Sequence, residues 1–86
     1  MAYQVRIKKS AKKELNKLPS HVLDRIIPAI KSLEKTPFPS GSKKLKGIGG
    51  NYWRIRIGDY RVIYEVDKGV KIIKVIRIAH RKDVYE

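Results

Sequence analysis

The spacing of apolar residues changes from a helical period in the first half of the chain to an alternating one in the second half. Residues 2–8 alternate weakly between apolar and polar, which predicts a half-buried strand. Two helices are expected next, the first capped by Ser10 and stopped at Pro19, the second capped by Ser20 and ended by Thr36. Together these two segments predict an αα-hairpin after the strand.

The second predicted helix contains a proline at position 28. Because the proline ring removes a backbone hydrogen bond to the carbonyl of Asp24, we expect a kink or a local break there. Residues 37–50 are rich in proline and glycine and are expected to form a long loop.

Three strands are predicted over residues 52–57, 60–66 and 70–79, joined by turns at 58–59 and 67–69. The third strand is nearly all apolar, which is typical of a central strand covered on both faces. The order β-α-α-β-β-β predicts an α+β fold, in which two helices pack on one face of a four-stranded, mainly antiparallel sheet.

Length and composition restrict the kind of protein. The 86 residues fit a single domain, 1–86. The chain has no cysteine, which excludes disulfides and thiolate metal sites. Its two histidines lie far apart in the sequence, and we interpret His21 as structural. We therefore expect no cofactor and no metal and, because no apolar run approaches a membrane span, a cytoplasmic protein without membrane contact.

Charge gives the strongest indication of a partner. Twenty-one lysines and arginines against eight acidic residues give a formal net charge of +13. Such a field favours polyanions, of which nucleic acid is the commonest in the cytosol. An anionic membrane is a weaker alternative, because the basic residues are not confined to one amphipathic helix.

Strand alternation indicates where the basic residues gather. If Trp53 and its apolar neighbours in residues 52–57 pack under the helices, then Arg54 and Arg56 project from the opposite face. Arg61 joins that face from the next strand. Because arginine forks match phosphate oxygens, this cluster predicts a site for a phosphate chain. The preceding loop carries three lysines that either extend this site or are simply solvated: Lys43, Lys44 and Lys46.

The C-terminal segment carries His80, Arg81 and Tyr85. A histidine can give or take a proton near neutral pH, and a tyrosine can donate one to a developing charge. These residues are candidates for proton transfer beside the arginines, although a lone histidine more often forms only a local hydrogen bond.

Four motifs together resemble the RelE/ParE superfamily of toxins from bacterial and archaeal type II toxin–antitoxin systems. They are Leu45-Lys46-Gly47, Trp53-Arg54-Ile55-Arg56, Gly58-Asp59-Tyr60-Arg61-Val62-Ile63-Tyr64-Glu65 and His80-Arg81-Lys82-Asp83-Val84-Tyr85. The resemblance is greater to the RelE branch and implies a RelE-like fold and an mRNA interferase, an endoribonuclease that cuts mRNA in the ribosomal A site. It also implies an acidic antitoxin as partner, with the free toxin a monomer and the complex a hetero-oligomer.

The resemblance implies roles for individual residues. Arg54 and Arg56 match the basic residues that open the family's central strands, Arg61 the arginine after the turn, Arg81 the arginine after the last strand, and Tyr85 the C-terminal tyrosine. His80 stands where some relatives have a histidine. The family's reaction needs no metal, because the 2′-hydroxyl of the RNA attacks the adjacent phosphate.

One departure concerns the general base. Some relatives have lysines at the first basic positions, whereas both are arginines here, and arginine effectively never loses its proton. The arginines are therefore assigned to positioning and charge stabilisation, which leaves proton transfer to His80 and Tyr85. Two alternatives remain open: a ParE-like inhibitor of DNA gyrase without nuclease activity, and a catalytically silent relative that binds RNA.

Overall fold

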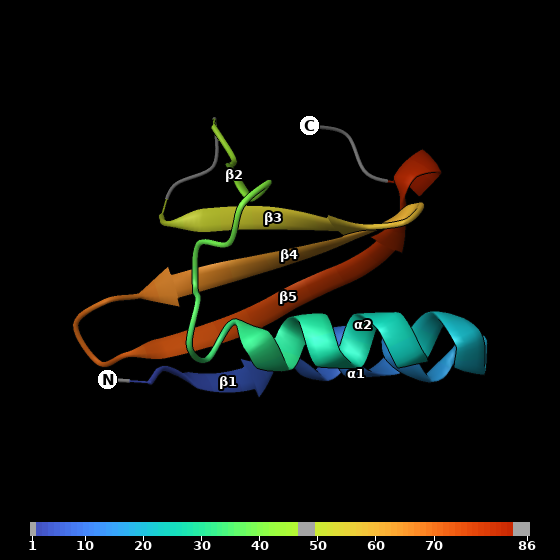
Figure 1. The fold of residues 1–86 in the computed structure, drawn as a ribbon, viewed down its shortest axis with the longest axis horizontal. Helices are drawn as coiled ribbons and strands as arrows, with labels where there is room; N and C mark the ends of the chain where they lie inside the picture. The colour runs from blue at the N-terminus through green and yellow to red at the C-terminus, as the bar shows by residue number, and fades with distance from the viewer. Residues whose placement is uncertain (1, 47–49, 84–86) are drawn as a thin grey trace.

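The computed structural model describes residues 2–46 and 50–83, which form one sheet and two helices (Figure 1). The elements in chain order are β1 (Gln4–Ile7), α1 (Lys9–Asn16), α2 (Ser20–Ser32), β2 (Lys43–Lys44), β3 (Tyr52–Ile57), β4 (Tyr60–Asp67), β5 (Ile72–His80) and a short 3₁₀ helix, η1 (Arg81–Asp83). In the described part of the chain, no helix is both long and apolar enough to cross a membrane.

The strands form a five-stranded sheet in the order β1-β5-β4-β3-β2. All neighbours are antiparallel except β1 and β5, which run parallel. Both helices lie on the same side of the sheet (Figure 1). The predicted α+β fold is confirmed, but the expected number of four strands was too small. The additional strand is β2, a two-residue segment inside the predicted loop, which carries no alternating pattern of its own.

The core lies between the helices and the sheet. Its side chains come from both helices, from the residue that follows α2 and from the helix-facing side of β3, β4 and β5: Ala11, Leu15, Ile26, Ile30, Leu33, Ile55, Val62, Tyr64, Val66, Ile73, Val75 and Ile78. Tyr64 is fully buried, and its hydroxyl donates a 2.8 Å hydrogen bond to the carbonyl of Pro37. This bond attaches the segment that follows α2 to the centre of the sheet.

The predicted helix caps were wrong by one or two positions. Lys8 and Pro19 occupy the N-cap positions of α1 and α2, and neither makes a side-chain capping hydrogen bond. Ser10 and Ser20 instead lie inside the first turns. Helical hydrogen bonds begin before the two serines: the Lys8 carbonyl accepts from the Lys12 N–H, and the Pro19 carbonyl accepts from the Leu23 N–H.

The local break expected at Pro28 does not form, because α2 continues through it from Ser20 to Ser32. Ile26 and Ile30 lie on either side of the proline and are both buried in the core. The burial of these two side chains stabilises the helix across the missing hydrogen bond.

Only one face of β5 is covered by helices, so the expectation of a strand buried on both faces was wrong. Lys74 and Arg77 are exposed, whereas Ile73, Val75 and Ile78 are buried. A register shift explains this pattern, because Ile63 pairs with Arg77 while Tyr64 pairs with Val75. Ile76 is therefore an extra residue, a β-bulge, and strict alternation fails at this point.

Candidate nucleic-acid interface

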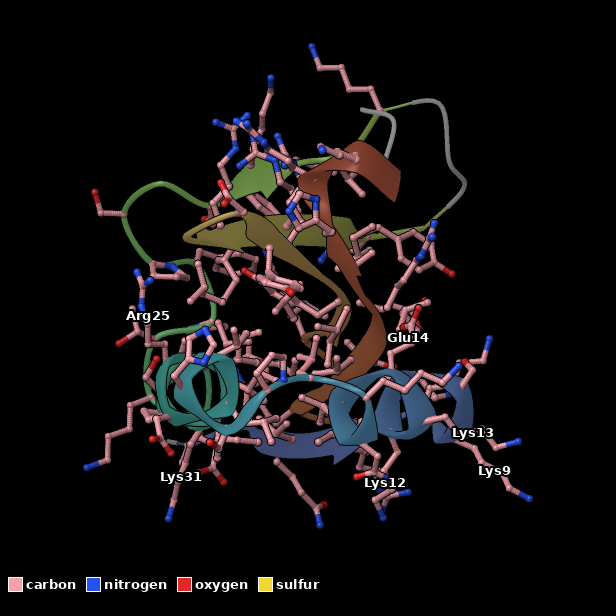
Figure 2. The ribbon with its side chains drawn as sticks, turned by 90° about the vertical axis from the view of Figure 1, so that its right-hand side faces the viewer. Lys9, Lys12, Lys13, Glu14, Arg25 and Lys31 are labelled. Carbon is pink, nitrogen blue, oxygen red and sulfur yellow. The ribbon has the colours of Figure 1, made fainter. Side chains whose placement is uncertain are left out.

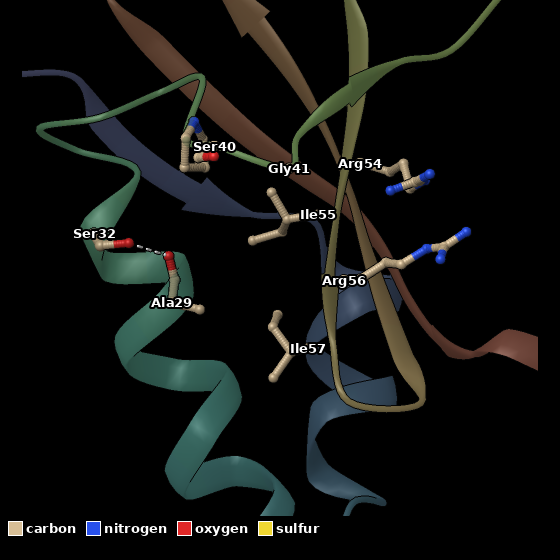
Figure 3. Close-up of a pocket in the computed structure, with 9 residues that line it drawn as sticks. Ala29, Ser32, Ser40, Gly41, Arg54, Ile55, Arg56 and Ile57 are labelled. Carbon is tan, nitrogen blue, oxygen red and sulfur yellow. Dashed lines mark hydrogen bonds between the residues drawn. The ribbon is translucent and has the colours of Figure 1, made fainter.

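The face of the sheet opposite the helices carries the predicted arginines. In Figure 3, Ile55 and Ile57 point from β3 toward α2, while Arg54 and Arg56 point to the other side of the strand. The alternation that predicted this arrangement is confirmed. We call this surface the open face and define it by Lys43, Arg54, Arg56, Arg61 and Arg77.

Arg56 and Arg61 lie directly opposite each other across the β3–β4 pair. Directly opposed residues have Cβ atoms about 4.5–5.5 Å apart, and like charges at that separation are destabilising. On β5 the next residue in this row is Ala79, a small residue that is itself 8% exposed. An anion bound at this row would offset the repulsion between the two guanidinium groups.

A second row of the open face runs through Arg54. In register order it contains Lys43, Arg54, Ile63 and Arg77. The Arg54 residue is only 6% exposed, so it does not project into solvent as the sequence suggested. Arg54 pairs with Lys43 of β2 on one side and with Ile63 of β4 on the other, whereas β2 does not extend as far as Arg56.

Arg77 was missed by the sequence analysis. It reaches the open face because of the bulge at Ile76, and its Nε lies 3.7 Å from Glu14 Oε2 on α1. No local sequence pattern signals the bulge, so alternation along β5 could not place this residue.

The three lysines predicted near the arginines do not behave alike. Lys43 pairs with Arg54 and so belongs to the open face, whereas Lys44 pairs with Trp53 and lies on the other face. Lys46 is exposed and follows β2. The strand register therefore supports only Lys43 as an extension of the arginine cluster.

Arg81 lies at the end of the sheet beside the β3–β4 turn. Its N–H donates a 2.7 Å hydrogen bond to the Asp59 carbonyl, and its Nε lies 3.8 Å from Asp59 Oδ1. Both side chains are mostly exposed, so the ion pair itself contributes little stability. The backbone hydrogen bond is what holds η1 against the turn that joins Arg56 to Arg61.

His80 is not on the open face. It pairs with Tyr60, which lies on the face of β4 that points toward the core. The rings of His80 and Tyr60 pack edge to face, with their centroids 5.4 Å apart. The Lys82 N–H donates to His80 Nδ1 at 3.2 Å. In the neutral ring the proton is then on Nε2, which makes Nε2 the available donor. Tyr85 lies outside the described residues.

Among the described residues, two of the cavities on the helix side of the sheet border predicted site residues. One, of about 540 Å³, borders the edge of β3 near Ser32 and Gly41 (Figure 3), and the side chains of Arg54 and Arg56 point away from it. The other, of about 360 Å³, is lined by both histidines. The sequence led to the interpretation of His21 as structural, and folding places it in the same cavity as His80. Within the described chain, no group of three or more histidine, aspartate or glutamate side chains could hold a metal ion.

Comparison with known proteins identifies the family. A family model described as the ParE toxin of the type II toxin–antitoxin system parDE matches residues 5–85. Toxin RelG of Mycobacterium tuberculosis is 30% identical over 86 residues, which cover 99% of this chain and 98% of that protein. Toxin RelE3 of Methanocaldococcus jannaschii is 35% identical over 78 residues, covering 86% of this chain and 85% of that protein.

The fold gives the same result. The crystal structure of the archaeal RelE–RelB complex from Pyrococcus horikoshii OT3 matches with a TM-score of 0.84 and 36% sequence identity, covering 98% of this chain and 100% of the matched chain. The chain therefore belongs to the RelE/ParE superfamily and is a toxin of the type II toxin–antitoxin class.

Proposed function

We propose that this toxin is an mRNA interferase that cleaves mRNA in the A site of the translating ribosome and so stops translation. The observation that carries the proposal is the direct opposition of Arg56 and Arg61 beside Arg54 on the face of the sheet without helices. Relatives named as RelE and RelG toxins support the same function.

The proposed reaction is an attack by RNA on itself. The 2′-oxygen of one nucleotide forms a bond to the adjacent phosphorus, and the bond from phosphorus to the 5′-oxygen of the next nucleotide breaks. The products are a 2′,3′-cyclic phosphate and a 5′-hydroxyl. Negative charge accumulates on the phosphate oxygens in the transition state, where Arg54, Arg56 and Arg61 stabilise it, with Arg81 contributing from the end of the sheet.

Two protons must move in this reaction, one from the 2′-hydroxyl and one to the 5′-oxygen. The arginines cannot accept the first, because they do not deprotonate in proteins. The Nε2–H of a neutral imidazole is too weak an acid to protonate the leaving oxygen, and His80 lies on the helix side of the sheet, so the phenol of Tyr85 is the better donor to that oxygen. Tyr85 therefore acts as the acid, and the proton of the 2′-hydroxyl passes to the neutral imidazole of His80 or to water.

We also propose that an acidic antitoxin neutralises this toxin and forms a hetero-oligomer with it, while the free toxin is a monomer. The matched P. horikoshii structure is a complex of RelE with RelB, and that of E. coli is a RelBE toxin–antitoxin complex. The net charge of +13 favours such an acidic, partly disordered partner.

An in vitro translation reaction tests the proposal. The purified chain is added to ribosomes translating a defined mRNA, and new 5′ ends are mapped by primer extension. We expect cuts that require ribosomes and are phased with codons. They should weaken by about 10²-fold or more in Arg61→Ala, because one charge-stabilising group is lost. They should also weaken in Tyr85→Phe and persist in Lys31→Ala, a matched loss of charge on α2. Intact mRNA with wild-type protein would contradict the proposal.

Inhibition of DNA gyrase is the second candidate function. The matched family model is described by ParE, and His80 lies away from the arginines of the open face. A supercoiling assay with purified gyrase distinguishes the two functions, because an interferase leaves supercoiling unchanged. A catalytically silent relative would bind ribosomes with a strong salt dependence and leave both mRNA and supercoiling intact.

A further inference from the structure

A second cluster of basic and aromatic side chains lies on the opposite side of the sheet from the open face. It lines the cavity of about 360 Å³ between the start of α2 and the turn that joins β3 to β4. The polar side chains come from three separate elements, namely His21 and Arg25 from α2, Tyr60 from β4 and His80 from β5. Pro19, Val22 and Ile57 form an apolar part of the wall.

Arg25 lies against a glycine in the turn. Gly58 has a φ of +61°, and a Cβ at this position would lie 3.1 Å from Arg25 Nη1. The absence of a side chain therefore lets the guanidinium lie close against the turn. In Figure 2, Arg25 extends from α2 toward the sheet, whereas Lys31 on the same helix points away.

The polar groups that line the cavity are mainly cationic or are neutral hydrogen-bond donors. Among the described residues, no carboxylate forms an ion pair with Arg25. Asp59 also lines the cavity and would repel an anion, but its carboxylate lies 3.8 Å from Arg81 Nε, which offsets that charge. His21 lies one helical turn before Arg25, so the two side chains share one face of α2.

We propose that this cavity is a phosphate-binding subsite, in which Arg25 supplies the charge and His21 and His80 supply N–H donors. A guanidinium with two imidazoles suits a phosphate monoester or diester, because its oxygens accept several charge-assisted hydrogen bonds at once. The β3–β4 turn separates this cavity from Arg56 and Arg61 on the open face. Under the proposed function, on which this assignment of the ligand rests, the phosphate belongs to an RNA backbone that continues around the turn. Free phosphate or a nucleotide is the other source.

The two histidines serve as probes of the cavity, because the chain contains no others and their ring signals can be assigned without overlap from further histidines. The ring signals of His21 and His80 are followed by NMR on ¹³C-labelled protein during titration with inorganic phosphate, with acetate and with a ten-nucleotide DNA oligonucleotide. The oligonucleotide has no 2′-hydroxyl, so it cannot be cleaved, and binding is measured whether or not the toxin is a nuclease. The same titrations are repeated with Arg25→Ala, His21→Asn and the control Lys31→Ala.

We expect both histidine signals to shift with phosphate, and affinity to fall about tenfold in Arg25→Ala while staying unchanged in Lys31→Ala, since one charge-assisted hydrogen bond is lost. His21→Asn should weaken the His80 shift without unfolding the chain. A His21 shift with the oligonucleotide that persists in an Arg56→Ala/Arg61→Ala variant assigns the subsite to the RNA backbone. A shift with phosphate alone supports the site and assigns it to free phosphate.

Three results would overturn the subsite. The first is the absence of any His21 shift with phosphate and with the oligonucleotide. The second is a His21 shift with acetate as large as that with phosphate. The third is an equal loss of phosphate affinity in Arg25→Ala and Lys31→Ala. The second would indicate a carboxylate partner such as an acidic peptide, and the third would indicate only the general field of the protein. Loss of mRNA cleavage in the translation assay would change none of these measurements, so the two proposals fail separately.

Discussion

Single side chains in this molecule have roles that depend on whether they face the core or the open face. Tyr64 illustrates the core side. It is fully buried and holds the carbonyl of Pro37 through its hydroxyl, and burial raises the pKa of Tyr64 to about 12, while a hydrogen bond with Ser42 opposes this shift. The folded state therefore favours the protonated phenol, and the fold should lose stability as the pH becomes alkaline.

Replacing Tyr64 by phenylalanine should change the pH dependence of stability. In the unfolded chain a tyrosine loses its proton near pH 10, whereas in the fold Tyr64 keeps it to about 12. The stabilisation is complete below pH 10 and is lost between pH 10 and 12, about 2–3 kcal/mol in all for a shift of this size.

Urea denaturation from pH 8 to pH 12 measures this effect. At pH 8, Tyr64→Phe should be about 1 kcal/mol less stable than wild type, because the Pro37 carbonyl loses its donor. Above pH 10 the difference should shrink and then reverse, since only the wild type carries the cost of the ionising phenol. Parallel stability curves for the two proteins would show that Tyr64 is not the group responsible.

At the scale of elements, the helices and the sheet are joined at the edge of β5. β1 pairs with β5 only from Ile72 to Val75, so the rest of that edge has no strand neighbour among the described residues. Glu14 on α1 replaces the missing strand, because its Oε1 accepts a 2.9 Å hydrogen bond from the Ile78 N–H. In Figure 2, Glu14 points from α1 toward the sheet, while Lys12 and Lys13 point away.

Glu14→Ala should destabilise the fold by about 1–3 kcal/mol, because it leaves a partly buried backbone N–H without its acceptor. Lys13→Ala is the matched control on the same helix, and it should change the free energy of unfolding by less than about 0.5 kcal/mol. Urea unfolding followed by circular dichroism measures both. If the two variants were equally stable, the hydrogen bond at the edge of β5 would not support the packing of α1.

Elements with an unbroken period could be predicted from the sequence, and those that depend on a partner could not. Alternation placed Arg54 and Arg56 correctly because β3 is regular along its length. It failed on β5, where the bulge at Ile76 resets the alternation and moves Arg77 to the open face. The strand β2 exists only through its pairing with β3, and the meeting of His21 with His80 depends on the packing of α2 against the sheet.

For the whole molecule, the sheet divides the chain into a covered face that provides stability and an open face that concentrates charge. The positive charge is not limited to the open face, because Lys9, Lys12 and Lys13 point outward from α1 (Figure 2). With a net charge of +13, any polyanion is attracted to the protein as a whole. The contribution of the open face must therefore be measured against a lysine of equal charge on the other face.

Lys43 and Lys44 provide that comparison, because they are adjacent in the chain, both exposed, and on opposite faces of the sheet. Affinity for a fluorescent DNA oligonucleotide is measured by anisotropy from low to physiological salt. For a single strand, the slope of log affinity against log salt concentration is about −0.7 for each phosphate neutralised. Lys43→Ala should make the slope shallower by about 0.7, since Lys43 lies opposite Arg54, while Lys44→Ala should leave it nearly unchanged. Equal changes in the two variants would mean that the overall charge, and not the open face, determines binding, and the arginine rows would then lose their assignment as the surface that holds RNA.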